Sequence, residues 1–416
     1  MRVELLTIGN ELLLGFTVDT NGPFIARQLA DLGIGVTRRV SVADDFDAIR
    51  GAVTDALERT GAVITTGGLG PTADDRTKPA VAAAFDRPLE ELDGEWDRLR
   101  ERWHSMGRRG EPPEANRQQM MLPAGATALP NANGTAPGVW VEDDRGRWCA
   151  MLPGVPREMR AMTLDALIPL LRERAGAGAP VIRSRLLRTT GLAESSLPTM
   201  LGDLAGGVDG LSLAYLPGID GIDLRLTGHD LPADDADAVL ARALARVAER
   251  IGDYAYGEDD TDLADVVLRR LRARGWRVAV AESCTGGLLG ARLTAIPGSS
   301  DVVVGGVIAY DNAVKERQLG VPPELLRSHG AVSEPVALAM ASGCRALLDT
   351  DVGIGITGIS GPGGGTADKP VGFTCVAIDI AGALQVRTVR FLSDRAENRY
   401  RSAQLALDMV RRAVAT

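Results

Sequence analysis

The seven residues 281–287, AESCTGG, place two possible nucleophiles side by side in front of a pair of glycines. Ser283 and Cys284 follow a strand-like run over residues 277–282 and precede an apolar helical pattern that begins at Leu288. The first amides of a helix have no acceptor within it, and the helix dipole adds positive charge at that end. Such amides stabilise the oxyanion that forms when a nucleophile attacks a carbonyl group. The amides expected to do so here belong to Thr285, Gly286 and Gly287.

A neutral serine hydroxyl needs a base, and the predicted partner of Ser283 is Lys315. His329 is the one histidine of the C-terminal part, and it lies far from any predicted strand end. Lys315 instead follows five residues after Tyr310, at the end of the strand-like run 301–310. A serine and lysine pair, with Tyr310 relaying a proton or orienting the pair, is therefore the natural alternative to a serine and histidine pair.

Cys284 is the rival nucleophile. A thiolate is more nucleophilic than a hydroxyl, and a helix N-terminus lowers the pKa of a thiol. Side chains alternate in an extended chain, so we expect only one of Ser283 and Cys284 to face the site. A helix-capping serine beside a buried cysteine, with no chemistry, fits this stretch equally well when the stretch is taken alone.

The chain has three lysines, and its other basic residues are arginines. Arginine replaces lysine readily on a solvated surface, but it does not give up a proton, so Lys78, Lys315 and Lys369 are candidates for a special role. Lys369 lies in a glycine-rich run, 355–372, whose amides suit a phosphate group. The run lacks the G-K-[ST] of a Walker loop, and a plain surface loop is the alternative.

Hydrophobic periodicity predicts three domains, residues 1–171, 180–256 and 259–416. The first alternates strand and helix patterns, which predicts a doubly wound α/β fold with a parallel sheet and helices on both faces. After a Gly/Ala/Pro-rich linker, two strand-like runs and one helix predict a small α+β domain. Its GIDG sequence at 218–221 has the G-x-x-G spacing of nucleic-acid loops, but the acidic Asp220 favours a hairpin turn. The last domain is predicted to be α/β, with three strand ends that gather the residues named above.

The composition excludes several classes of function. The 416 residues carry a net charge of -9 and have a pI near 5.1, which argues against general binding to nucleic-acid phosphates. No run approaches 18 apolar residues and the first residues lack an apolar leader, so a cytoplasmic protein without a membrane partner is expected. The four cysteines form no C-x-x-C pair, which indicates free thiols rather than a disulfide framework or a zinc site.

Five stretches of the C-terminal part resemble the amidase domain of the CinA family: AESCTGG, AYDNAVKERQLGV, GAVSEPVA, GITGISGPGGGTADKPVG and NRYRSAQLAL. The resemblance implies hydrolysis of nicotinamide mononucleotide to nicotinate mononucleotide and ammonia, without a cofactor. It assigns the nucleophile to Ser283 rather than Cys284, the base to Lys315 and a further catalytic role to Tyr310. The substrate-binding residues that it implies are Thr285, Gly286, Gly287, Thr357, Gly363, Gly364, Lys369 and Arg399.

The N-terminal part resembles the MoaB/MogA molybdopterin-binding fold that this family shares, through GNELLLGFTVDTN, VADD, TTGGLGPTADDRT, NANGTAPG and LPGVPREM. Glycine amides after a strand can hold a phosphate, and carboxylates at the next helix start can hold a hard cation or merely cap the helix. The resemblance implies a metal-dependent ADP-ribose pyrophosphatase that uses Mg or Co. Its nucleotide site would comprise Gly67, Gly68, Asp44 and Asp75, with Asp74 and Asp75 as metal ligands. Lys78-Pro79 departs from the acidic or small residues expected after DDRT.

The resemblance also implies a KH-like middle domain and a homodimer that acts on small nucleotides. Three classes of function compete. An amidase releases ammonia from nicotinamide mononucleotide, whereas a molybdopterin-handling transferase adenylylates its substrate with ATP, using Asp44 and Asp75. A non-catalytic nucleotide-binding or DNA-uptake accessory protein binds its ligand without turnover, and the acidic net charge argues against the DNA version.

Overall fold

The computed structural model describes residues 1–91, 94–176 and 178–414. The chain packs into two compact units, which we describe separately. The N-terminal unit comprises Met1–Arg183 and Gly228–Val239, and the C-terminal unit comprises Ser184–Thr227 and the chain from Leu240 onwards. The predicted boundaries of three domains stay a prediction, since this division runs through the middle segment.

The N-terminal unit is built on a six-stranded sheet with the order β2-β1-β3-β8-β7-β6. Strands β2, β1, β3 and β8 are parallel, as predicted, and β7 and β6 add an antiparallel edge. The strands are β1 (Arg2–Ile8), β2 (Gly35–Val42), β3 (Ala62–Thr66), β6 (Thr127–Leu129), β7 (Gly138–Glu142) and β8 (Trp148–Leu152), with a separate pair β4 (Leu89–Glu91) and β5 (Met121–Pro123).

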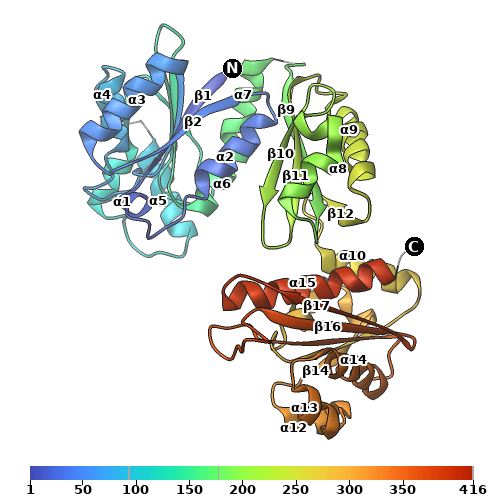
Figure 1. Ribbon diagram of the computed structural model, residues 1–416. Coiled ribbons are helices and arrows are strands. Elements are labelled where there is room, and N and C mark those ends of the chain that lie inside the picture. The colour runs from blue at the N-terminus through green and yellow to red at the C-terminus, as the bar shows by residue number, and fades with distance from the viewer. Residues whose placement is uncertain (92–93, 177, 415–416) are drawn as a thin grey trace. The chain divides into compact units, whose positions relative to one another are not determined.

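Helices cover both faces of this sheet, as Figure 1 shows. They are α1 (Asn10–Leu13), α2 (Asn21–Ala30), α3 (Phe46–Thr60), α4 (Thr77–Ala84), α5 (Glu95–Ser105), α6 (Pro156–Met162) and α7 (Ile168–Ala175). Alternate strand residues supply two cores: Leu6 and Val63 pack with α3 and α4, while Leu5 and Ile64 pack with α2, α6 and α7. The doubly wound arrangement follows from strands that are apolar on both faces.

Helix α3 begins and ends at residues whose types favour helix termini. The Asp45 carboxylate accepts a hydrogen bond from the Ala48 amide at 3.0 Å and caps the helix. Gly61 ends the helix with a φ of 75°, a left-handed conformation that glycine adopts without strain. The apolar residues Ile49, Val53 and Leu57 recur at helical spacing and are buried.

The middle segment forms a four-stranded sheet with the order β10-β11-β9-β12. The elements are β9 (Val181–Thr189), α8 (Leu197–Leu201), β10 (Ser212–Pro217), β11 (Ile222–Leu231), α9 (Ala236–Ile251) and β12 (Ala255–Glu258). The sequence predicted only the strands corresponding to β9 and β11. The predicted hairpin at 218–221 is confirmed, because the Gly218 amide donates to the Gly221 carbonyl at 2.8 Å between antiparallel β10 and β11.

The rest of the C-terminal unit contains a five-stranded sheet with the order β14-β13-β15-β16-β17. Its strands are β13 (Val278–Glu282), β14 (Val303–Ile308), β15 (Val352–Gly358), β16 (Phe373–Ile380) and β17 (Ala383–Arg390). Its helices are α10 (Leu263–Ala273), α11 (Leu288–Thr294), α12 (Asn312–Leu319), α13 (Pro323–His329), α14 (Glu334–Leu347) and α15 (Arg395–Ala413). Figure 1 shows α15 on one side of β16 and β17 and α14 on the other.

The side chains of β13 point alternately to the two faces of the sheet, which explains why helices pack on both faces. Val278 and Val280 pack against α10 and α15, whereas Ala279 and Ala281 face α14 and α12. Strands β14, β13 and β15 are parallel neighbours, and Glu282 pairs in register with Ile308 and Ile356. The carboxyl ends of these three strands therefore meet at one edge of the sheet, as the sequence predicted.

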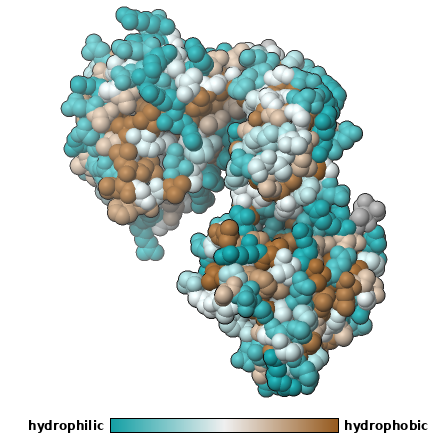
Figure 2. All heavy atoms as spheres, viewed as in Figure 1, coloured by the Kyte–Doolittle hydropathy of each residue, from teal (hydrophilic) through white to brown (hydrophobic). Residues whose placement is uncertain are grey.

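Exposed apolar side chains are unevenly distributed. Figure 2 shows apolar residues grouped on the viewed face of the N-terminal unit. Three large apolar side chains in the loop after α1 are strongly exposed: Leu14 at 68%, Phe16 at 83% and Val18 at 81%. Among the described residues, no helix combines the length and apolar character that a membrane crossing requires.

Candidate active site

A cavity of about 290 Å³ lies at the carboxyl ends of β13, β14 and β15. Its lining brings together residues that are far apart in the sequence. The lining residues are Ser283, Cys284, Tyr310, Asn312, Lys315, Ala331, Val332, Thr357, Gly358, Ile359, Ser360, Gly361, Gly363, Gly364 and Arg395. The predicted catalytic residues Ser283, Lys315 and Tyr310 are all in this set, and His329 is not.

Ser283 lies directly after β13 and is held in place by its backbone. Its amide donates to the Ile356 carbonyl of neighbouring β15 at 2.9 Å. The buried Glu282 carboxylate accepts hydrogen bonds from the amides of Gly287, Leu289 and Gly290 at 2.7–3.0 Å. Glu282 therefore satisfies the free amides at the start of α11 and fixes the turn that presents Ser283.

The expectation of three free amides was wrong for two of them. The Gly287 amide donates to Glu282, and the Gly286 amide donates to the Ser283 carbonyl at 3.1 Å. Within the part of the chain that the structure describes, the amides of Cys284 and Thr285 have no acceptor. These two amides are the available oxyanion donors. The Thr285 side chain is fully buried and does not reach the cavity.

Cys284 lines the same cavity as Ser283, but it is only 7% exposed and belongs to the apolar core around β13. The expectation that only one of the two side chains faces the site stays a prediction. The chain leaves the extended conformation at Ser283 and turns, and the alternation of a strand no longer applies there. Burial raises the pKa of the Cys284 thiol to about 11, against a smaller opposing effect of the Ser360 hydroxyl. The thiol is consequently protonated near neutral pH.

Lys315, in α12, is 1% exposed. Its Nζ donates to the carbonyl oxygens of Ala309 at 2.8 Å and Tyr310 at 3.1 Å. Burial lowers the pKa of the Lys315 amine, and the negative charge of Asp311 opposes this effect. A neutral amine has two N–H groups and one lone pair, so the two carbonyls satisfy its donors and leave the lone pair available.

Tyr310 and Arg395 lie together at the cavity. Tyr310 is 62% exposed, and its hydroxyl accepts a hydrogen bond from Arg395 Nη2 at 3.2 Å. Arg395 Nη1 donates to the Gly361 carbonyl at 2.7 Å. Sequence reasoning missed Arg395, although one signal was present: it is the first residue of α15, where a positive charge opposes the helix dipole.

The remaining predicted residues divide into two groups. Thr357, Gly363 and Gly364 line the cavity, and the Thr357 hydroxyl donates to the Ala331 carbonyl at 2.8 Å. Lys369 and Arg399 are outside the lining, so their predicted contact with substrate stays a prediction. Lys369 Nζ donates to the His329 carbonyl at 2.6 Å, and Arg399 donates through Nε and Nη2 to the Thr285 carbonyl at 3.2 and 2.6 Å. Arg399 thus supports the loop that follows the nucleophile.

A second cavity, of about 390 Å³, lies in the N-terminal unit and is lined by Gly68, Asp75 and Glu158 among others. Gly68 needs to be glycine, because a Cβ there would lie 2.2 Å from the Thr77 hydroxyl oxygen. Gly67 is outside the lining, and its amide donates to the Leu152 carbonyl at 3.0 Å. The amides of residues 68–70 make no hydrogen bond within the described chain, which suits a phosphate.

Asp44 and Asp74 are absent from the lining of this cavity, and their predicted roles in it stay a prediction. The Asp44 carboxylate accepts the Asn10 amide at 2.8 Å, outside this cavity. Asp74 is exposed, and the Thr72 hydroxyl holds its pKa below the ordinary value. Asp75 accepts hydrogen bonds from the Thr72 amide at 2.9 Å and the Thr72 hydroxyl at 2.5 Å.

This cavity offers a divalent metal two carboxylates, so the remaining ligands would have to come from a bound phosphate and water. Within the described residues, no group of three or more His, Cys, Asp or Glu side chains forms a metal site. Asp75 and Glu158 are the two carboxylates that line the cavity. Mg²⁺ commonly takes one or two protein carboxylates together with substrate phosphates and water. The residues therefore fit a metal that is bound jointly with a phosphate ligand.

Three family models match consecutive parts of the chain. A probable molybdopterin binding domain matches residues 4–173, the KH domain of damage-inducible protein CinA matches 184–257, and the CinA C-terminal domain matches 260–414. A CinA-like protein from Gemmatimonas aurantiaca is 57% identical over 419 residues, which cover 100% of this chain and 97% of the relative. The chain belongs to the CinA family.

Other CinA proteins are also similar along the chain. A CinA-like protein from Chlorobaculum tepidum is 42% identical over 417 residues, covering 98% of this chain and 97% of the relative. The crystal structure of a competence/damage inducible protein from Agrobacterium tumefaciens matches 36% of this chain and 93% of its own, with 40% identity and a TM-score of 0.36. The predicted family and the mixed α/β fold class, with MoaB/MogA-like, KH-like and CinA C-terminal parts, are confirmed.

Proposed function

We propose that the C-terminal site hydrolyses the carboxamide of nicotinamide mononucleotide to nicotinate mononucleotide and ammonia. The observation that carries this proposal is the shared cavity of Ser283 and the buried amine of Lys315. A hydroxyl nucleophile, an amine with a lowered pKa and two available backbone amides are the groups that amide hydrolysis by a serine needs.

The reaction proceeds in two halves. Neutral Lys315 takes the Ser283 hydroxyl proton while Oγ attacks the carboxamide carbon, and the amides of Cys284 and Thr285 stabilise the oxyanion. The Lys315 ammonium then returns the proton to the leaving nitrogen, which departs as ammonia and leaves an ester on Ser283. Lys315 then takes a proton from water as the water oxygen attacks the ester carbon. The Lys315 ammonium returns this proton to the leaving Ser283 Oγ, which releases nicotinate mononucleotide and restores the free enzyme. Arg395 and the glycine-rich loop bind the substrate phosphate at the cavity mouth.

The N-terminal cavity supports a second activity, the metal-dependent cleavage of ADP-ribose to AMP and ribose 5-phosphate. The amides of residues 68–70 would bind the diphosphate, and Asp75 and Glu158 would hold a divalent metal, Mg or Co. The metal supplies Lewis acidity toward the phosphoryl oxygens. A molybdopterin adenylyltransferase would use the same phosphate-binding amides, and a non-catalytic nucleotide-binding protein would use them without turnover.

One experiment separates these functions. The purified protein is incubated with nicotinamide mononucleotide, with ADP-ribose, or with ATP and molybdopterin, each with Mg²⁺, Co²⁺ or EDTA, and products are identified by mass. We expect nicotinate mononucleotide from nicotinamide mononucleotide with either metal or with EDTA, and AMP with ribose 5-phosphate from ADP-ribose only when metal is present. Transfer of AMP to molybdopterin would favour the transferase, and binding without products would favour the accessory protein. The assembly as a homodimer in the cytoplasm belongs to the same proposal, and light scattering tests the dimer.

A further inference from the structure

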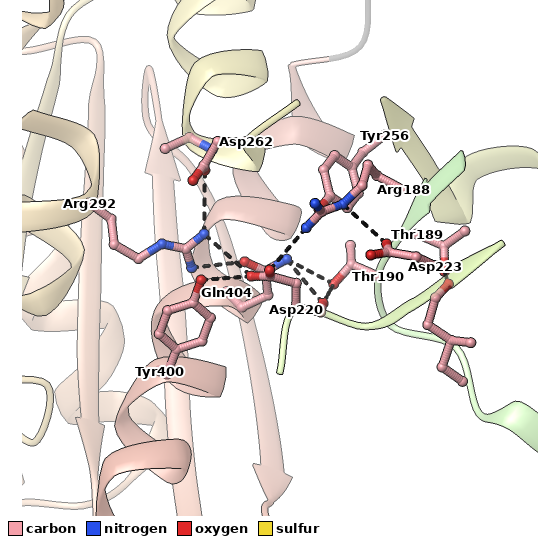
Figure 3. A network of polar contacts seen from close by, with 12 residues as sticks. Arg188, Thr189, Thr190, Asp220, Asp223, Tyr256, Asp262, Arg292, Tyr400 and Gln404 are labelled. Carbon is pink, nitrogen blue, oxygen red and sulfur yellow. Dashed lines mark hydrogen bonds and ion pairs between the residues drawn. The ribbon is translucent and has the colours of Figure 1, made fainter. Parts of the chain in front are cut away.

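The hairpin loop at 218–221 contacts the C-terminal helix α15 through Asp220. Both segments belong to the C-terminal compact unit. Figure 3 shows Asp220 at the centre of a polar network, with Arg188 on one side and Arg292, Tyr400 and Gln404 on the other. The loop with the G-x-x-G spacing of nucleic-acid-binding loops therefore packs against a helix of the same chain.

The Asp220 carboxylate joins the two sides of this network. Its Oδ2 lies 3.0 Å from Arg188 Nη2, and its Oδ1 accepts the Tyr400 hydroxyl at 2.7 Å. Arg292 Nη2 lies 3.8 Å from Oδ1, with its side chain only 9% exposed and stacked over the Tyr400 ring at 4.5 Å. Arg188 and Arg292 are largely buried, so removing the charge of the carboxylate between them would leave both guanidinium groups with less compensation in a poorly solvated place, which is costly.

Backbone contacts secure the same loop. The Asp220 carbonyl accepts Gln404 Nε2 at 3.1 Å and the Thr190 hydroxyl at 2.8 Å. Gly221 has no room for a side chain, because a Cβ would lie 2.0 Å from the Thr189 carbonyl oxygen. Burial, together with the Asp220 hydrogen bond, raises the pKa of Tyr400 to about 12, so its hydroxyl remains a donor at physiological pH.

The N-terminal turns of α15, directly before Tyr400, contact the catalytic loops. Arg395 donates to the Tyr310 hydroxyl and the Gly361 carbonyl, and Arg399 donates to the Thr285 carbonyl. Asn398, which is fully buried, donates to the Ser360 carbonyl at 3.1 Å. One continuous helix therefore holds the loops after β13, β14 and β15, and its next turn is held by Asp220.

We propose that Asp220 is a positioning residue for the C-terminal site, acting through Tyr400, Gln404 and the rigid helix α15. The middle segment then contributes to hydrolysis without touching the substrate, because it fixes the helix that sets Thr285, Tyr310 and Gly361. The catalytic readout of this proposal rests on the proposed amidase function. A change at Asp220 shifts the positions of the reacting groups and leaves their chemistry unchanged. We therefore expect kcat to fall more than KM rises.

The test compares Asp220→Asn with Asp223→Asn in the full-length protein. Asp223 pairs with the same Arg188, at 3.1 Å, but makes no described contact with α15, which makes it a matched control. We expect Asp220→Asn to lower kcat for nicotinamide mononucleotide on the order of 10-fold, since small misplacements are costly in catalysis, with a smaller change in KM. The kcat of Asp223→Asn should stay within about twofold of wild type, because this change leaves the contacts of α15 in place.

Hydrogen exchange gives a readout that is independent of activity. Backbone amides of residues 395–402 should exchange faster in Asp220→Asn than in Asp223→Asn, because a neutral amide accepts the Tyr400 hydroxyl less strongly than the carboxylate does and no longer pairs with Arg292. Tyr400→Phe removes only the hydroxyl, and it should also speed amide exchange over residues 395–402, but by less than Asp220→Asn does. In Asp220→Asn combined with Tyr400→Phe, the second change should add little, since the two groups form one contact.

The outcomes separate the two proposals. Equal kcat in the Asp220 and Asp223 variants, or equal exchange over 395–402, overturns the positioning role. If the wild-type protein releases no ammonia, the amidase function fails, and the exchange comparison alone decides whether Asp220 holds α15. Faster exchange together with the selective loss of kcat supports the proposal.

Discussion

Ser283 and Cys284 are neighbours in the chain and line the same cavity. The turn that starts at Ser283 makes this possible, and the Glu282 carboxylate stabilises the turn by accepting three amides of the following helix. A shared cavity lining therefore does not by itself choose between the two nucleophiles. Protonation does, because burial raises the pKa of the thiol to about 11 and the hydroxyl reacts through a base.

The first prediction concerns this choice. Ser283→Ala should abolish ammonia release from nicotinamide mononucleotide, whereas Cys284→Ala should retain most of it. Near pH 7 only about one thiol in 10,000 is ionised when its pKa is four pH units higher, so the cysteine contributes little as a nucleophile. Ammonia release is measured by a coupled assay, with the folded state of both variants checked by circular dichroism. Loss of activity in the Cys284 variant alone would reverse the assignment.

The second prediction concerns Lys315, whose amine must be neutral to accept the Ser283 proton. Burial lowers its pKa, so the rate should rise with pH as the fraction of neutral amine grows. Lys315→Arg keeps the charge but cannot release a proton, and it should lose activity almost as severely as Lys315→Ala, by a factor on the order of 100 to 10,000. Profiles of rate against pH for the three proteins check this. An arginine variant within about threefold of wild type would instead indicate substrate binding by Lys315.

Residues at strand ends could be placed from the sequence, whereas long side chains that donate to distant carbonyls could not. Ser283, Tyr310 and Thr357 come together as predicted, because the ends of parallel neighbouring strands share one edge of a sheet. Lys369 and Arg399 do not reach the cavity, since each donates to a backbone carbonyl that the sequence does not reveal. Hydrogen bonds between a long side chain and a distant carbonyl depend on how the loops fold, and local patterns carry no record of them.

The same limit applies to the amides and the edge strands. The amide of Gly287 was expected to be free because it precedes a helix, but the buried Glu282 accepts it. Strands β10, β12 and β17 are short or exposed, so their residues lack the continuous apolar runs that marked the central strands. Pairing with a neighbouring strand, rather than their own composition, makes them strands.

The third prediction is that the two proposed activities are separable. Asp75→Asn should reduce metal-dependent cleavage of ADP-ribose on the order of 100-fold, because it removes one of two cavity carboxylates, and should leave deamidation unchanged. Asp74→Asn is the matched control, since Asp74 is the adjacent carboxylate and lies outside the cavity. EDTA should stop the first activity and spare the second. Equal loss in both aspartate variants would contradict the placement of the metal at Asp75.

The fourth prediction concerns Lys78, the buried lysine of the N-terminal unit. Its Nζ donates to the carbonyl oxygens of Gln118 and Gln119, both at 2.7 Å. Burial lowers its pKa from the ordinary value of 10.5 to about 7, and the nearby charge of Asp75 opposes this only in part. Lys78 therefore changes its charge in the physiological pH range without lining either predicted site.

Between about pH 7 and pH 10.5, the unfolded chain holds a proton on Lys78 that the folded chain has released. The free energy of unfolding should consequently rise with pH over this interval, by at most ~1.4 kcal/mol per pH unit, and level off outside it. Lys78→Met should remove this rise. Its absolute stability is not diagnostic, because the substitution also leaves two carbonyls without a donor. Urea unfolding from pH 6 to pH 10 with EDTA, in a Trp276→Phe background, follows the four tryptophans of the N-terminal unit. Parallel pH profiles for the lysine and methionine proteins would show that the Lys78 pKa is not lowered in the folded state.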